Sequence, residues 1–116
     1  MKPSLLFLVT SDPRTSARPA EAVRIAAGVG AWQKAIVRLY LRDAAVLALN
    51  EFTDGLLDED NFTRYLPMLR EANPPVWVQK GNPLLAELGE PAVPFAEIDD
   101  AQLARHCAAS SHVLRF

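Results

Sequence analysis

The chain has 116 residues, half of them apolar and 22% charged, and its formal net charge is -2 at pH 7. This length suits one domain with one hydrophobic core, and the composition excludes an intrinsically disordered chain. Without a basic run there is no footprint for nucleic acid or for an anionic membrane, and no apolar stretch approaches the roughly 20 residues of a membrane span.

The cysteine content points to a reducing compartment. Cys107 is the one cysteine in the sequence, so it cannot form an internal disulfide, and a solitary thiol is typical of intracellular proteins. The apolar run near the N-terminus ends after about half a dozen residues, which is short of a signal-peptide core. We therefore expect a cytoplasmic protein.

The opening residues predict a strand, a helix and a second strand. The apolar run Ser4–Val9 is too short for a globular helix and is typical of a strand covered on both faces. From Pro19 to Trp32 apolar residues recur at helical spacing, and Pro19 and Glu21 both suit a first helical turn. Residues 35–41 form a second apolar run, which we expect to be parallel to the first because a helix separates them.

The middle of the chain is more polar. Asp43 is placed to cap a short helix that reaches Leu49. Residues 50–60 are typical of a solvated loop, and their acidic side chains leave a hard-cation site as a weaker alternative. An apolar helical face follows over residues 62–69, where Pro67 must kink the helix or begin a new turn.

The second half predicts three further strands. Val76–Gln79 is rich in β-branched and aromatic residues, which favour a strand. Asn82 is a natural N-cap, with Pro83 in the first turn and Gly89 ending the helix. Residues 92–95 are interpreted as a fourth strand at an edge of the sheet, because Pro94 cannot donate to a ladder.

The last helix and strand close the chain. Asp99 or Asp100 caps a helix on which Leu103, Ala104, Cys107 and Ala108 share one face, and residues 111–116 form the fifth strand. Alternation of strands and helices predicts an α/β fold, specifically a three-layer α/β/α sandwich around a mostly parallel five-stranded sheet. We expect a single domain over residues 1–116, with Trp32 and Trp77 in its core.

A candidate binding site lies where the first three strands end. The loops after parallel strands converge on one rim, which is where open α/β sheets bind ligands. The hydroxyl, basic and acidic side chains predicted at this rim are Ser11, Arg14, Ser16, Arg18, Asp43 and Lys80.

These rim residues allow two interpretations. In the functional one, a helix N-terminus, hydroxyls and the cations Arg14, Arg18 and Lys80 bind a phosphate, a sulfate or a carboxylate. In the structural one, Ser16 or Arg18 satisfies free backbone N–H groups, Arg14 is a solvated charge, and Asp43 is a cap rather than a base. The loop has no glycine-rich cradle for a nucleotide, and we predict no metal and no cofactor.

Four segments give the chain a family resemblance. They are residues 10–13 (TSDP), the alanine-rich helix over residues 20–30, residues 41–46 (LRDAAV) and the closing residues 110–116 (SSHVLRF). In these features the sequence resembles the DsrE/DsrF/DsrH family of small sulfur-relay proteins, whose relatives include the Tus subunits of tRNA thiolation. The resemblance implies a parallel α/β sandwich that forms homo-oligomers or joins paralogous subunits, with the fourth and fifth strands at the sheet edges.

The sequence departs from this family at the residue that carries sulfur. Sulfur-carrying members have a persulfide-bearing cysteine in the loop after the third strand, but here residues 78–82 read VQKGN. A persulfide needs a thiolate, which neither Gln79 nor Lys80 can supply. Cys107 lies on the apolar helix face, where a thiol usually acts as a small hydrophobe, and His106 next to it in sequence points about 100° away around the helix.

Three hypotheses follow from the sequence. The preferred one is a non-catalytic DsrE-like oligomeric module that carries no sulfur of its own. The alternatives are a sulfurtransferase or sulfur carrier that uses Cys107, and a small-anion or nucleotide-binding domain at the rim of the sheet. An enzyme is the less favoured interpretation.

Overall fold

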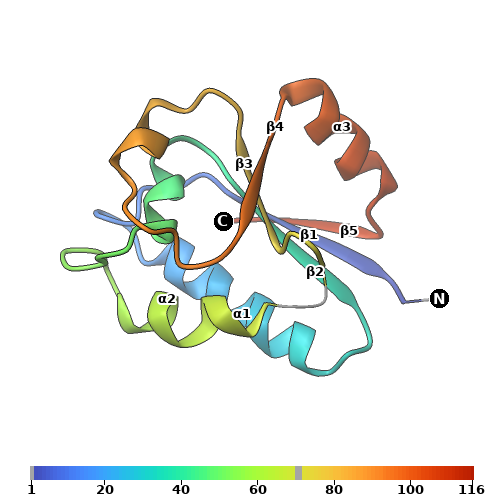
Figure 1. Cartoon of the computed structure of the whole chain (residues 1–116). Coiled ribbons are helices and arrows are strands. Elements are labelled where there is room, and N and C mark those ends of the chain that lie inside the picture. The colour runs from blue at the N-terminus through green and yellow to red at the C-terminus, as the bar shows by residue number, and fades with distance from the viewer. Residues whose placement is uncertain (1, 70–71) are drawn as a thin grey trace.

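Five parallel strands form one sheet in the order β4-β3-β2-β1-β5 (Figure 1). The computed structural model describes residues 2–69 and 72–116. Its strands are β1 (Ser4–Val9), β2 (Ile36–Leu41), β3 (Val76–Gln79), β4 (Phe95–Ile98) and β5 (His112–Arg115). The predicted α/β sandwich is confirmed, and the sheet is entirely parallel rather than mostly so.

Helices cover both faces of this sheet. The α-helices are α1 (Arg18–Ala31), α2 (Asp60–Tyr65) and α3 (Asp100–Ala109), and the 3-10 helices are η1 (Asp43–Leu49), η2 (Leu66–Met68) and η3 (Pro83–Glu87). Pro67 falls where α2 gives way to η2, as the kink prediction required. No helix in the described residues combines the length and the apolar character that a bilayer span needs.

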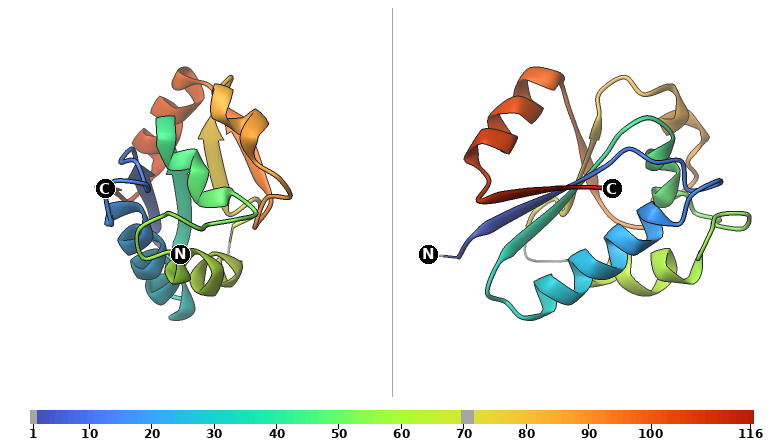
Figure 2. Two further views of the ribbon diagram at one scale, coloured as in Figure 1. Left: turned by 90° about the vertical axis from the view of Figure 1, so that its left-hand side faces the viewer. Right: turned by 180° about the vertical axis from the view of Figure 1, so that it is seen from behind.

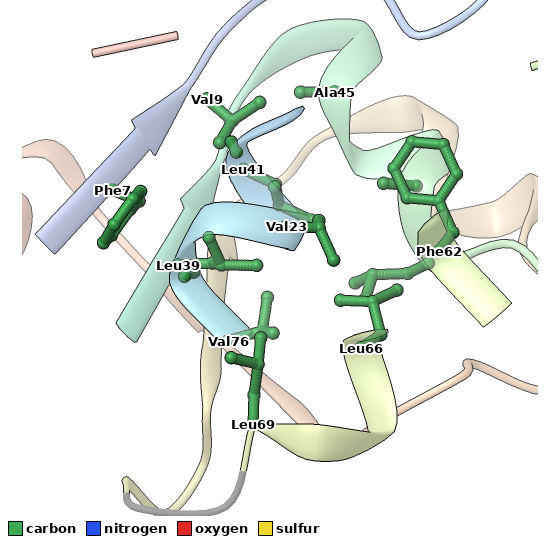
Figure 3. Packing of buried hydrophobic residues seen from close by; sticks show 14 of the residues in the cluster. Phe7, Val9, Val23, Leu39, Leu41, Ala45, Phe62, Leu66, Leu69 and Val76 are labelled. Carbon is green, nitrogen blue, oxygen red and sulfur yellow. The ribbon is translucent and has the colours of Figure 1, made fainter. Parts of the chain in front are cut away.

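The main core lies on the face covered by α1, α2 and the 3-10 helices. Strand side chains that point to this face, such as Phe7, Leu39 and Val76, are almost completely buried. Small residues of α1 let the helix approach the sheet closely, and Phe62 and Leu66 close the core from α2 and η2 (Figure 3). Burial of this large apolar area is the main stabilising contribution of the fold.

The opposite face is covered by α3 (Figure 2). Its buried cluster is small and consists of Leu6, Tyr40, Trp77 and Ile98, against which Leu103 and Cys107 of α3 pack. All four residues of β5, at the sheet edge, are exposed. In the described residues this face is therefore much less deeply covered than the α1 face.

Three local predictions are wrong. The fourth strand begins at Phe95 and not at residue 92, because the chain straightens into the ladder only after Pro94. Trp32 is 73% exposed, since α1 ends at Ala31 and Gln33 turns the chain with φ 59°. Ala108 is exposed and does not pack with Leu103 and Cys107 against the sheet, whereas Ala104 lines the same cavity as those two residues.

Of the three predicted helix caps, one is wrong and two are confirmed. Asp43 does not cap η1 through its side chain; it takes a left-handed conformation with φ 54°, and Arg42 occupies the N-cap position. The Asn82 cap is confirmed, because its Oδ1 accepts from the backbone N–H of Leu84 at 2.9 Å. Asp99 caps α3 in a capping box with Gln102.

Candidate functional site

The loops that follow β2 and β3 are tied together at the carboxyl rim of the sheet. The backbone N–H of Asp43 donates to Oε1 of Gln79 at 3.0 Å, and Nδ2 of Asn82 donates to the carbonyl oxygen of Asp43 at 3.0 Å. The same Nδ2 lies 3.1 Å from Oε1 of Gln79. Asn82 is only 6% exposed, so its amide joins the two loops from inside the junction. A buried amide is stable because its polar atoms find partners.

The loop after β1 contacts the C-terminal residues of the chain. The hydroxyl of Ser11 donates to the carbonyl oxygen of Phe116 at 3.2 Å, and Arg18 donates to the carbonyl oxygen of Arg115 at 3.1 Å. The Arg18 guanidinium also lies 5.8 Å from the centre of the Phe116 ring. The hydroxyl of Ser16 accepts from the backbone N–H of Arg18 at 3.1 Å, which is the structural interpretation considered from the sequence.

Arg14 is neutralised within its own loop. Its Nη2 lies 2.9 Å from Oδ2 of Asp12, and its Nε lies 3.0 Å from Oδ1 of the same carboxylate. This side-chain hydrogen bond holds the pKa of Asp12 below its ordinary value, because it favours the ionised carboxylate. Two of the three predicted rim cations, Arg14 and Arg18, are thus engaged by protein groups, whereas the side chain of Lys80 is exposed.

A second charged pair stands where β2 ends. Arg42 donates to the hydroxyl oxygen of Tyr40 at 3.0 Å and to Oδ1 of Asp100 at 2.8 Å. The hydrogen bond from Arg42 lowers the pKa of Asp100, while burial raises the pKa of Tyr40 against the opposing effect of Arg42. Since Arg42 and Asp100 are 58 positions apart, the sequence contained no local signal for this pair.

Cys107 lines a cavity of about 360 Å³ between α3 and the sheet. Thr10, Arg42, Asp100 and Arg115 contribute its polar lining, so the cavity reaches the carboxyl rim on the α3 side. The thiol is half-buried and packs against the small α3-face core. His106 instead lines a different cavity and stacks on Trp77, so the adjacent histidine and cysteine face different cavities.

The described residues contain no cluster of side chains that could bind a metal ion. Among residues 2–69 and 72–116, no three His, Cys, Asp or Glu side chains lie together in a way that could hold a metal ion. The acidic loop over residues 50–60, which left a hard-cation site as an alternative, is included in that range.

With this geometry in view, comparison with solved structures is informative. The chain shares its fold with the YchN protein of E. coli. The crystal structure of YchN matches with a TM-score of 0.79 and 21% sequence identity over 100% of both chains. The match confirms the predicted α/β fold with its parallel five-stranded sheet.

The likeness to YchN establishes the fold and nothing further about chemistry. No protein-family model matches the sequence, and no curated protein matches it. Of the predicted site residues, Asp43 is brought to the loop after β3, where Lys80 lies. Ser11 and Arg18 bond to the C-terminal residues, and Ser16 bonds to the backbone of Arg18. Gln79, Asn82 and Arg42 are not among the predicted site residues, because their contacts at the rim join segments far apart in the sequence.

Proposed function

We propose that this chain is a non-catalytic, DsrE-like oligomeric module whose carboxyl rim is a structural junction rather than a reaction centre. The observation that carries the proposal is the loop after β3, which contains no thiol and in which the side chains of Gln79 and Asn82 are committed to the fold. Oε1 of Gln79 accepts two hydrogen bonds, and Asn82 uses both ends of its amide. A sulfur relay needs a nucleophilic thiolate at its transfer point, and this loop offers none.

The edge strand β5 supports the oligomeric part of the proposal. Val113 and Leu114 are 38% and 36% exposed, and β5 lies at an open edge of the sheet. Exposed apolar residues on an unpaired edge strand favour pairing with another chain. We therefore expect β5 and the adjoining α3 face to contribute to the interface.

Oligomeric state in solution tests this proposal. Light scattering coupled to size-exclusion chromatography should give a homo-oligomer at micromolar concentration, and Cys107→Ser should leave its mass unchanged. Val113→Lys should shift the population toward the monomer, whereas Leu57→Lys, at a loop residue of 43% exposure, should not. A strictly monomeric wild-type chain would contradict the proposal.

A sulfur carrier that uses Cys107 is the second candidate. It is supported by the half-buried thiol, which lines a cavity together with Arg42 and Arg115. The reaction would transfer the outer sulfur of a small persulfide to the Cys107 thiolate, giving a protein persulfide and releasing the donor as a thiol.

Intact-mass spectrometry separates the two candidates. After incubation with a persulfide donor, a sulfur carrier should gain the mass of one sulfur atom on the folded chain, and Cys107→Ser should abolish the gain. Absence of an adduct on folded protein would remove this second candidate and leave the first.

A further inference from the structure

A second cavity on the α3 face lies at the opposite end of the sheet from the rim. It has a volume of about 150 Å³ and is enclosed by the beginnings of β1 and β2, by β3, and by the last turn of α3. Its lining includes Ser4, Leu6, Ile36, Arg38, Trp77 and His106. This cavity shares no lining residue with the one that contains Cys107.

Among the described residues that line this cavity, Arg38 is the one permanently charged side chain. It is half-buried, its Nε donates to the carbonyl oxygen of Pro74 at 3.0 Å, and its guanidinium carbon lies 3.9 Å from the centre of the Trp77 ring. No Asp or Glu of the described chain forms an ion pair with it. A guanidinium carries five N–H donors and stays protonated in proteins, so four donors are left for another partner.

His106 closes the cavity without competing for an anion. Its imidazole stacks on the Trp77 ring at 3.8 Å, which fixes the indole between β3 and α3. Burial, followed by the positive charges of Arg38 and Arg105, holds the pKa of His106 below its ordinary value of 6.5. The ring is therefore neutral at pH 7, and the positive charge at the cavity is that of Arg38.

The remaining lining combines a hydroxyl with apolar walls. The hydroxyl oxygen of Ser4 accepts from the backbone N–H of Ser111 at 3.2 Å, which leaves the hydroxyl hydrogen able to donate. Leu6 and Ile36 provide apolar surface. Since liquid water occupies about 30 Å³ per molecule, the cavity suits a ligand of about four to six heavy atoms.

We propose that this cavity binds a small monocarboxylate with a short apolar body, whose carboxylate pairs with Arg38. A guanidinium presents parallel N–H groups that match the two oxygens of a carboxylate, and a half-buried cation without an acidic partner is stabilised when such an anion arrives. The apolar walls favour an alkyl chain over a fully hydrated tetrahedral anion. This site uses neither the rim nor Cys107.

Tryptophan fluorescence can report binding directly. The chain has two tryptophans, and Trp32→Phe removes the one that is 73% exposed, so that the remaining signal comes from Trp77 beside Arg38. Titration of this variant with butyrate at constant ionic strength should give a saturable change. Butanamide, which has the same shape without the charge, and inorganic phosphate should bind at least about tenfold more weakly.

Variants of the arginine complete the test. In the Trp32→Phe background, Arg38→Gln should weaken butyrate binding at least about tenfold, and Arg38→Lys should weaken it less, because it retains the charge without the planar fork. Arg105→Gln, on the same helix as His106, is the control and should bind normally. Circular dichroism checks that each variant is folded. The proposal is overturned if butyrate gives no saturable change, if butanamide or phosphate binds as well, or if folded Arg38→Gln retains the affinity.

Discussion

Removal of the Asn82 side chain tests whether one buried amide holds the carboxyl rim together. In Asn82→Ala, the backbone N–H of Leu84 loses the cap at the start of η3, and the carbonyl oxygen of Asp43 loses a donor. Oε1 of Gln79 keeps its other hydrogen bond, from the backbone N–H of Asp43. The substitution therefore combines the loss of a helix cap with the loss of a link between two loops.

The structure sets the size of the expected effect. Replacing an asparagine cap by alanine costs about 1 kcal/mol, and leaving a polar partner unsatisfied costs about 1 to 3 kcal/mol when it is buried. Asp43 is exposed, so water can reach its carbonyl oxygen and the lower value applies. We expect the free energy of unfolding to fall by about 2 kcal/mol in Asn82→Ala.

Asn82→Asp separates the two contributions. An aspartate still offers an oxygen to the N–H of Leu84, so the cap is retained, but it places a carboxylate against the oxygens of Asp43 and Gln79. We expect a loss of at least about 1 kcal/mol from the missing donor alone. Asn50→Ala is the matched control, because the Asn50 side chain forms no hydrogen bond with residues 2–69 or 72–116, and it should change stability by less than about 0.5 kcal/mol.

Urea unfolding followed by circular dichroism measures these differences. The denaturant dependence should stay constant, since the variants expose the same surface on unfolding. If Asn82→Asp has the same free energy of unfolding as the wild type, the Asn82 amide does not join the loops. If Asn82→Ala also has the wild-type value, the helix cap contributes nothing to stability. Either result would refute the structural-junction account of the rim.

Three further predictions concern the core, a turn and the α3 face. Phe62→Ala should lower the free energy of unfolding by about 3 to 5 kcal/mol, because Phe62 is 1% exposed, whereas Phe52→Ala, at 71% exposure, should change it by less than about 0.5 kcal/mol in the same urea assay. Gly81→Ala should lower the free energy of unfolding by about 1 kcal/mol because of its φ of 75°, whereas Gly28→Ala in α1 should raise it by up to about 1 kcal/mol. Equal effects of the two substitutions would contradict this backbone argument. The folded-state pKa of His106 lies below 6.5, so the unfolded chain binds more protons than the folded chain as the pH falls below that value. Stability should therefore fall as the pH drops below about 6.5, and His106→Gln should flatten this pH dependence in thermal melts.

Much of the sheet could be predicted from the sequence because its strands are covered on both sides. Ser4–Val9 and Val76–Gln79 were predicted with their observed bounds, since a short apolar run with polar flanks has few other structures available. The edge strands were harder. β4 and β5 are less buried, so their bounds are less sharply marked in the sequence. β4 lies over Phe95–Ile98 where the sequence predicts residues 92–95, and β5 lies over His112–Arg115 where it predicts residues 111–116.

Backbone conformation explains the other errors. Asp43 and Gln33 both adopt positive φ, which is uncommon for residues other than glycine and has no signature in a single sequence. The turn at Gln33 directs Trp32 into solvent, and the turn at Asp43 directs its backbone toward Gln79 and Asn82. These contacts form across sequence separations that periodicity does not detect.

The hydrophobicity pattern of β2 does not reveal the environment of Arg38. β2 reads IVRLYL, and the sequence interpretation treated it as an apolar strand despite the arginine at its centre. Strand alternation places Arg38 with Leu6 and Tyr40 on the α3 face, whereas Val37 and Leu39 enter the main core. A cation is tolerated there because α3 leaves cavities beside the sheet. At the rim, most of the predicted polar side chains bond to other protein groups, whereas the Arg38 guanidinium on the α3 face lines a cavity and has no acidic partner among the described residues.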